Sequence, residues 1–234
     1  MIEISGLSVH FGGVCALDGV SLRICDDVAG IIGPNGAGKS TLVNVLSGFV
    51  RPSSGSVLVE GTDLLSLSPH RRARWGLSRS FQKVQIVDDL RVEDHVQVVL
   101  DARQRTRHER EKTTRDVLAY VGLTSRAGAL GAELNQFERR MTEIARCLAA
   151  APRIVLLDEP GGGLSEVETA RLRAVIEGIR PRFGAQVLLI DHDVDLIRAV
   201  CGRTAVLDFG RLIAFGPTRT VLQDDQVKAA YLGR

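Results

Sequence analysis

Long apolar runs are absent from this sequence. No run approaches the ~20 consecutive apolar residues that a membrane-spanning helix needs. The first residues, Met1-Ile2-Glu3-Ile4, lack the charged stretch and the apolar core of a signal peptide. We therefore expect that any role at a membrane depends on a partner protein.

Cysteine is sparse, and charge of one sign does not dominate. The cysteines are far apart in the sequence, and none belongs to a Cys-x-x-Cys pair or a Cys/His cluster: Cys15, Cys25, Cys147 and Cys201. This spacing argues against a zinc site and a disulfide framework, and reduced thiols are expected. Lysine and arginine total 30 against 28 acidic residues, a balance that does not support a dedicated nucleic-acid binder.

Short β-rich runs alternate with helical patterns along much of the chain. With 234 residues and 44% apolar content, the chain can fill a substantial core. The runs Ile154 to Leu157 and Val187 to Ile190 are apolar without alternation, which is typical of central strands covered on both faces. The pattern predicts an α/β sheet with crossover helices. Further strands are expected at Val20 to Ile24, Val28 to Ile32, Ser56 to Val59 and Thr204 to Leu207.

Between about Val92 and Ala151 the strand signal disappears and helix-forming residues dominate. This stretch predicts a helical lobe inserted into the sheet domain. We place the α/β core in 1–82 and 151–234 and the helical lobe in 83–150, within one domain that spans 1–234. The charged run from Arg103 to Arg115 is interpreted as a solvated helix face.

The strongest motif is a glycine-rich loop between an expected strand and an expected helix: Gly33-Pro34-Asn35-Gly36-Ala37-Gly38-Lys39-Ser40-Thr41. That context is the one a phosphate-binding loop requires. The glycines let the backbone N–H groups wrap around phosphates, Lys39 adds a positive charge, and the Ser40 hydroxyl can bind Mg²⁺. The alternative, a glycine-rich turn without a ligand, is disfavoured by the complete motif.

Two acidic residues, Asp158 and Glu159, follow the apolar run Ile154 to Leu157. At the carboxyl end of a strand, where α/β sheets bind ligands, Asp158 can hold Mg²⁺ through water and Glu159 can activate the attacking water. Paired acids are often only a polar strand end. Their combination with the phosphate loop predicts a site that hydrolyses a nucleoside triphosphate.

Together these motifs resemble the nucleotide-binding domain of ABC transporters, along nearly the whole chain. The resemblance implies a P-loop NTPase fold: a RecA-like core sheet, an N-terminal antiparallel β region and an inserted α-helical lobe. It implies that Phe11 stacks on adenine, although an ordinary core phenylalanine is the alternative. It also makes Gln82 a Mg²⁺ and water contact, and His192 a contact of the γ-phosphate.

Several short segments are most similar to the ATPase subunits of branched-chain amino acid importers. Urea and short-chain amide importers share the pattern, and the lipopolysaccharide-export ATPase shares part of it, so the cargo stays open. The segments are Phe11-Gly12-Gly13, Leu46-Ser47-Gly48-Phe49, Pro69-His70-Arg71, Arg79-Ser80-Phe81-Gln82, Glu143-Ile144-Ala145-Arg146 and Ala230-Tyr231-Leu232-Gly233.

The resemblance also implies cofactors and partners. ATP and Mg²⁺ are the expected cofactors, with Ser40, Gln82 and Asp158 as the Mg²⁺ contacts. The expected partners are a second ABC ATPase subunit, transmembrane permease subunits and, for an importer, an extracytoplasmic substrate-binding protein, with no nucleic acid. The expected location is the cytoplasmic face of the cell membrane.

One segment departs from the family pattern. In the family, an LSGGQ-like signature at the start of a helix contacts the γ-phosphate held by the opposite subunit. The corresponding segment here, Leu134-Asn135-Gln136-Phe137-Glu138, has no small residue to allow close backbone approach. Glu138 is expected to face the triphosphate, where a like-charge pair at ~4 Å costs about 4 kcal/mol at an effective dielectric of ~20. Ser165 also stands where the family usually has Asp or Asn.

The phosphate loop, Gln82, Asp158, Glu159 and His192 are nevertheless intact. We therefore predict an asymmetric heterodimer, in which this chain supplies the catalytic residues of the competent site and a different subunit supplies its signature. The main prediction is an ATPase that energises transport of branched-chain or other hydrophobic amino acids through a separate permease. The alternatives are a nucleotide-sensing regulatory subunit that does not hydrolyse ATP, and a DNA-repair ATPase, which would need a coiled-coil or zinc-bearing insertion.

Overall fold

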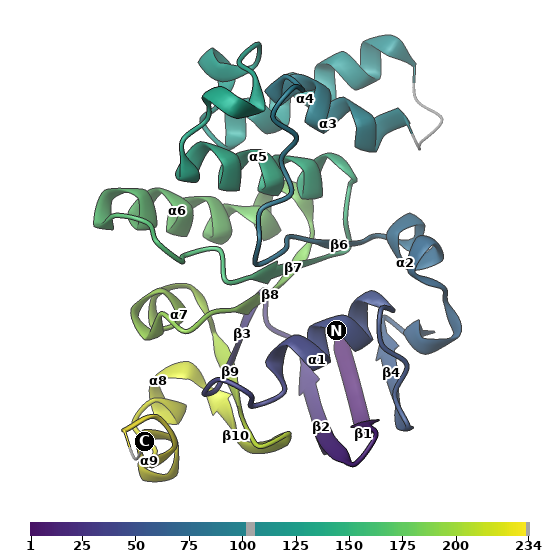
Figure 1. The fold of residues 1–234 in the computed structure, drawn as a ribbon, viewed down its shortest axis with the longest axis vertical. Helices are drawn as coiled ribbons and strands as arrows, with labels where there is room; N and C mark the ends of the chain where they lie inside the picture. The colour runs from purple at the N-terminus through teal and green to yellow at the C-terminus, as the bar shows by residue number, and fades with distance from the viewer. Residues whose placement is uncertain (102–105, 233–234) are drawn as a thin grey trace.

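The structure is a computed structural model that describes residues 1–101 and 106–232 (Figure 1). The charged run from Arg103 to Arg115 and the C-terminal segment from Ala230 to Gly233 lie partly outside these ranges. Among the residues described, no helix combines the length and the apolar content needed to cross a membrane.

A six-stranded sheet forms the centre of the molecule, in the order β10-β9-β3-β8-β7-β6. The neighbours from β9 to β6 pair in parallel, and β10 pairs antiparallel with β9 at one edge. The strands are β3 (Val28–Ile32), β6 (Leu77–Arg79), β7 (Ile154–Asp158), β8 (Gln186–Ile190), β9 (Arg203–Asp208) and β10 (Arg211–Pro217).

A second, antiparallel sheet has the order β2-β1-β4-β5 and lies at the opposite end of the molecule from the helices α3 and α4 (Figure 1). Helix α1 (Lys39–Ser47) shares a core with both sheets, since Leu42 and Leu46 lie in one cluster with residues of β1 and β3. The helix that follows the glycine-rich loop is therefore anchored between the two sheets. The strands are β1 (Ile2–Phe11), β2 (Val14–Ile24), β4 (Ser54–Val59) and β5 (Thr62–Asp63).

Three helices lie between β6 and β7 in the sequence and gather at one end of the molecule (Figure 1). They are α3 (Val92–Asp101), α4 (Arg107–Tyr120) and α5 (Gln136–Ala149). The other helices are α2 (Pro69–Trp75), α6 (Glu166–Phe183), α7 (Val194–Val200), α8 (Thr218–Val221) and α9 (Asp225–Leu232).

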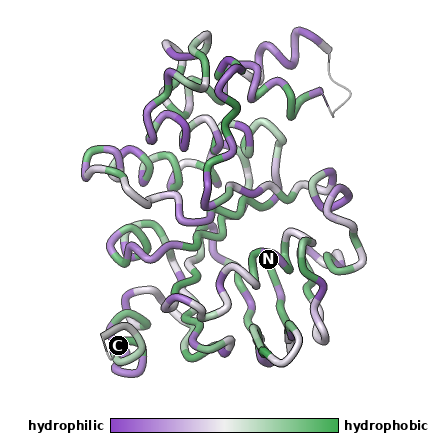
Figure 2. Tube along the Cα trace, viewed as in Figure 1, coloured by the Kyte–Doolittle hydropathy of each residue, from purple (hydrophilic) through white to green (hydrophobic). Residues whose placement is uncertain are grey.

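The central strands are buried on both faces because successive residues enter two different cores. Val155 and Leu157 of β7 pack in a cluster with residues of α5 and α6, whereas Ile154 and Leu156 pack in the cluster that contains α1. Figure 2 shows hydrophobic residues following these strands through the interior. The unbroken apolar runs of β7 and β8 are thus explained, and the prediction of central strands is confirmed.

All the predicted strands are present, and five of the six are longer than expected, β2 by the most. The run Val20 to Ile24 is the end of the eleven-residue β2, and Ser56 to Val59 is most of β4. The individual strands β1 and β10 were not expected from local patterns. β10 is an edge strand whose central residues are only half-buried, and exposed residues interrupt the buried positions of β1.

Replacement of Leu189 by alanine tests the two-sided burial of the central sheet. Leu189 is fully buried in β8, so Leu189→Ala should lower the free energy of unfolding by about 2 to 5 kcal/mol. For a chain of this size the melting temperature falls by roughly 2 to 4 °C per kcal/mol, which thermal unfolding can measure. Val98 is 59% exposed on α3, and Val98→Ala is the control that should leave the melting temperature unchanged. Equal falls of the melting temperature in both variants would contradict the two-sided burial of the sheet.

Candidate functional site

The glycine-rich loop connects β3 to α1 and packs tightly against neighbouring backbone. A Cβ atom on Gly33 would lie 2.2 Å from the Leu207 carbonyl oxygen, and one on Gly38 would lie 2.6 Å from the Ala16 carbonyl oxygen. Gly38 also has a φ of +100°, which side-chain-bearing residues rarely adopt. Glycine is therefore required at both positions by packing against β9 and β2.

The Lys39 side chain is folded into the loop itself. Its Nζ donates hydrogen bonds to the carbonyl oxygens of Gly33 at 2.6 Å and Pro34 at 2.9 Å. Burial lowers the pKa of Lys39, while the charges of Glu159 and Asp158 act in the opposite direction. The ammonium group thus lies within the field of both acidic residues that the sequence singled out.

A cleft of about 370 Å³ opens over the loop. Its polar wall is made by Gln82 and Glu159, and its apolar wall includes Val14, Cys15 and Ala16 of β2 and Phe209. The remaining lining residues are Asn35, Gly36, Ala37, Gly38, Lys39, Ser40 and Thr41. The cleft therefore combines phosphate-binding backbone with an apolar wall, as a nucleotide site requires.

Phe11, the predicted adenine contact, is not among the residues that line this cleft. It lies at the end of β1, paired with Val14 of β2, and its residue surface is 52% exposed. Val14 does line the cleft. Phe11 therefore does not line the cleft itself, but it pairs with Val14, which belongs to the apolar wall.

Gln82 and Glu159 meet at the polar wall, although they come from different segments. The Gln82 Nε2 donates a hydrogen bond of 2.8 Å to Glu159 Oε2. His192 is close to the same carboxylate, with 3.8 Å between its Nδ1 and Glu159 Oε2, and its side chain is 63% exposed. All three predicted catalytic side chains are thus neighbours at the carboxyl end of β7 and β8.

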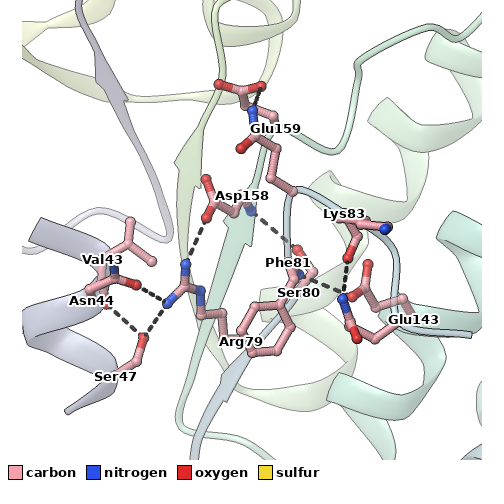
Figure 3. A network of polar contacts seen from close by, with 12 residues as sticks. Val43, Asn44, Ser47, Arg79, Ser80, Phe81, Lys83, Glu143, Asp158 and Glu159 are labelled. Atoms are coloured by element: carbon pink, nitrogen blue, oxygen red, sulfur yellow. Dashed lines mark hydrogen bonds and ion pairs between the residues drawn. The ribbon is translucent and has the colours of Figure 1, made fainter. Parts of the chain in front are cut away.

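Asp158 is held by an arginine of β6. Arg79 forms an ion pair of 2.9 Å with Asp158 Oδ2, and both side chains are nearly buried. The same guanidinium donates to Asn44 Oδ1 at 2.7 Å and to Ser47 Oγ at 3.2 Å, both on α1 (Figure 3). The backbone N–H of Asp158 donates to the Ser80 hydroxyl at 3.1 Å. Arg79 therefore joins the helix after the phosphate loop to the strand that carries the acidic residues.

The predicted Mg²⁺ contacts fit a magnesium–nucleotide complex by their chemistry. Ser40 and Gln82 line the cleft and offer a hydroxyl and an amide oxygen, and Asp158 offers a carboxylate. Mg²⁺ prefers such oxygen ligands and usually shares its coordination with water and phosphates. Throughout 1–101 and 106–232, no group of three or more His, Cys, Asp or Glu residues is arranged to hold a metal by itself.

The segment from Leu134 to Glu138 forms the start of α5. Asn135 is the N-cap, with its Oδ1 accepting from the Glu138 N–H at 2.8 Å, while Glu138 Oε2 accepts from the Asn135 N–H at 3.1 Å. Glu138 also forms an ion pair of 2.9 Å with Arg126. Its charge is therefore turned toward the helix cap and partly compensated, so the expected repulsion of a triphosphate is weaker than the charge alone suggests. Phe137 is buried in the core.

Ser165, the other departure from the family pattern, has a similar local role. It caps α6: its Oγ accepts from the Glu168 N–H at 3.4 Å, and the Glu168 carboxylate accepts from the Ser165 N–H at 2.9 Å. A serine in this place is thus accounted for by helix capping.

Comparison with known proteins agrees with this geometry. The sequence profile described as "ABC transporter" matches residues 17–162. The chain belongs to the ABC transporter family. It is 35% identical, over all of its length and 98% of the relative's, to the high-affinity branched-chain amino acid transport ATP-binding protein BraF of Pseudomonas aeruginosa. It is also 35% identical, over 97% of its length and 63% of the relative's, to the methionine import ATP-binding protein MetN of Mesorhizobium japonicum.

Solved structures share the complete fold. The ADP conformation of MJ1267, an ATP-binding cassette of an ABC transporter, matches with a TM-score of 0.91 at 26% identity, covering 100% of this chain and 99% of that chain. The predicted α/β P-loop fold is thereby confirmed. This ABC-family chain is an ATP-binding and ATP-hydrolysing subunit, of a class in which cassettes pair with one another and work with transmembrane permease subunits.

Several residues around the site were not predicted. Arg79 and Asp191 act through contacts with distant segments: Asp191 is fully buried, and its Oδ2 accepts the Gly161 N–H at 3.0 Å. Burial raises the pKa of Asp191. Arg79 lies in a segment that resembles the family, and this resemblance could have marked it as a site residue. No sequence pattern marked Phe209 or Cys15 as residues of the cleft wall.

Thiol labelling tests the cleft directly. Burial raises the pKa of Cys147 and of Cys201 to about 12, so neither forms thiolate at neutral pH, whereas Cys15 and Cys25 are exposed. Ellman's reagent should therefore modify two thiols in the folded chain and all four after unfolding. ATP should slow the reaction of Cys15, which lines the cleft, and not that of Cys25.

The variants Cys15→Ser and Cys25→Ser separate the two rates. An unchanged Cys15 rate at saturating ATP would show that the nucleotide does not occupy this cleft.

Proposed function

We propose that this chain is the catalytically competent ATPase of an asymmetric pair that energises a branched-chain amino acid importer. The observation that carries the proposal is the contact between Gln82 and Glu159 beside the phosphate loop, with 2.8 Å between the amide nitrogen and the carboxylate oxygen. A family glutamine and an acid that activates water are thereby adjacent where the γ-phosphate of a bound nucleotide would lie.

Each site residue has a distinct role in this proposal. The loop from Gly33 to Thr41 and Lys39 bind the phosphates, and Phe11 contacts the base from the apolar side of the cleft. Glu159 orients and deprotonates the attacking water, and His192 contacts the γ-phosphate. Ser40, Gln82 and Asp158 would hold Mg²⁺, which would supply charge neutralisation to the phosphates.

The start of α5 supports the proposed asymmetry of the pair. Asn135, Gln136 and Phe137 replace the small residues that would let backbone N–H groups approach a phosphate, and the Asn135 and Glu138 side chains already occupy one another's backbone N–H groups. This segment is poorly suited to complete a site on the opposite subunit. The catalytic residues of this chain instead require a signature from a different subunit.

The relatives support a proposal for the cargo and the partners. The branched-chain amino acid protein BraF matches over nearly its whole length, whereas the methionine import protein MetN extends well beyond the match. We therefore favour branched-chain amino acids, a permease in the cell membrane and an extracytoplasmic binding protein. The chain then works on the cytoplasmic face of that membrane.

The catalytic acid is tested by Glu159→Gln. Glutamine keeps the size and can still bond to Gln82, but it cannot accept the proton of water. The variant should lower turnover by about 100- to 10,000-fold, in line with the loss of a general base, and leave ATP affinity unchanged. Phosphate release measures turnover, and fluorescent-nucleotide titration measures affinity. Glu166→Gln, at an exposed acid in the first turn of α6, is the control; comparable losses in both variants would argue against a specific role of Glu159.

The pairing is tested by comparing the chain alone with a mixture that contains the second ATPase encoded beside it. The chain alone should stay monomeric with ATP in size-exclusion chromatography and turn over slowly. The mixture should form ATP-dependent heterodimers with turnover that Glu159→Gln abolishes. Robust turnover by the chain alone would overturn the asymmetry, and a mixture without turnover would favour a nucleotide-sensing subunit.

A further inference from the structure

A buried arginine lies behind the two proposed catalytic side chains. Arg140, in the second turn of α5, has a side chain only 6% exposed. Its guanidinium donates to three backbone carbonyls from two other segments: Phe81 at 3.0 Å, Gln82 at 3.4 Å and Glu159 at 3.3 Å. One side chain therefore contacts the backbone of both Gln82 and Glu159, whose own side chains meet at 2.8 Å.

Glu143, one turn further along α5, completes this arrangement. Its Oε2 lies 3.3 Å from Arg140. Its Oε1 accepts the Phe81 N–H at 3.0 Å, and both residues are labelled in Figure 3. The Glu143 side chain is 3% exposed, and burial raises its pKa. The peptide groups on both sides of Phe81 are thus held by α5, one through its N–H and one through its carbonyl.

Stability alone is a poor explanation for this pair. Burying two charges costs desolvation energy that their attraction often only offsets, so apolar replacements of buried ion pairs are frequently neutral or stabilising. What a guanidinium adds is geometry, because its planar fork can donate to several acceptors in fixed directions. Here the acceptors are carbonyls of the two segments that carry Gln82 and Glu159.

The backbone of Glu159 needs such support. Its φ is +48°, a left-handed conformation that costs a non-glycine residue energy and persists only where the surroundings fix it. Its N–H donates to the Ile190 carbonyl at 2.7 Å, and its own carbonyl accepts from Arg140. The peptide groups before and after the strained residue are therefore both fixed by contacts to other segments.

We propose that Arg140 is the positioning residue for Gln82 and Glu159, and that it ties their placement to the first turn of α5. The inference rests on the proposed function of these two residues in hydrolysis. Because the segment from Leu134 to Glu138 begins the same helix, a displacement of this segment by the opposite subunit is transmitted to the catalytic acid through a single helical turn. A displacement of this chain's signature segment would then change the positions of Gln82 and Glu159 in the competent site.

The test is Arg140→Lys, which keeps the charge and removes the fork. In the mixture of both ATPases, kcat should fall about 10- to 100-fold, the size expected when a catalytic group is misplaced by about 1 Å, while the Kd for ATP stays within about threefold. Combined with Gln82→Ala, the losses should be far from additive, since both changes disturb one unit.

Arg72→Lys is the matched control. Arg72 is also buried, at 4% exposure. It too donates to three backbone carbonyls, those of Leu67, Val45 and Leu46. Val45 and Leu46 lie in the last turn of α1, away from the phosphate loop. Its replacement should lower the melting temperature about as much as Arg140→Lys without changing kcat. If both variants lose kcat and stability in the same proportion, or if Arg140→Lys keeps kcat within threefold, the proposal is wrong.

Hydrogen exchange of the chain alone gives a readout that needs no turnover. In Arg140→Lys, amide exchange should accelerate in the segments 80–84 and 158–162, and in Arg72→Lys it should not. Exchange unchanged in both segments would overturn the positioning role even if the mixture proves inactive. Failure of the proposed function appears separately, as wild-type turnover that does not depend on Glu159.

Discussion

The parallel alignment of β3, β7 and β8 is the constraint on which the site depends. Ile31 of β3 and Asp158 of β7 both pair with Ile190 of β8, so the three strands end at the same level. The segments that follow them carry the phosphate loop, Glu159 and His192. The observed register therefore brings three distant parts of the chain to one edge of the sheet.

Sequence patterns predicted the fold and the candidate site residues. They could not predict the contacts that these residues make with distant segments. The runs of β7 and β8 and the glycine-rich loop each carry their signal within a few neighbouring residues. Arg79 lies in a family-like segment, but its contact with Asp158, 79 positions away, could not be read from that local pattern. Glu138 is a different case, because Asn135 followed three residues later by a glutamate is a readable capping signal. Alignment with the family signature predicted that the Glu138 charge faces a triphosphate, and it did not predict the helix cap.

The two departures from the family pattern share a physical feature. Asn135 with Glu138 and Ser165 with Glu168 both form reciprocal caps, at the starts of α5 and α6. Each pair satisfies backbone N–H groups that a helix start leaves without partners. At both places the reciprocal cap stabilises the start of a helix.

The left-handed backbone at Glu159 has a consequence for how this chain can change. Glycine would adopt the same φ of +48° without strain. The residue that the backbone conformation favours here is therefore one without a carboxylate. Strain of this kind costs of order 1 to 3 kcal/mol, a noticeable share of the stability of a domain. Backbone strain therefore favours glycine or asparagine at this position, whereas the proposed role of Glu159 in hydrolysis requires a carboxylate.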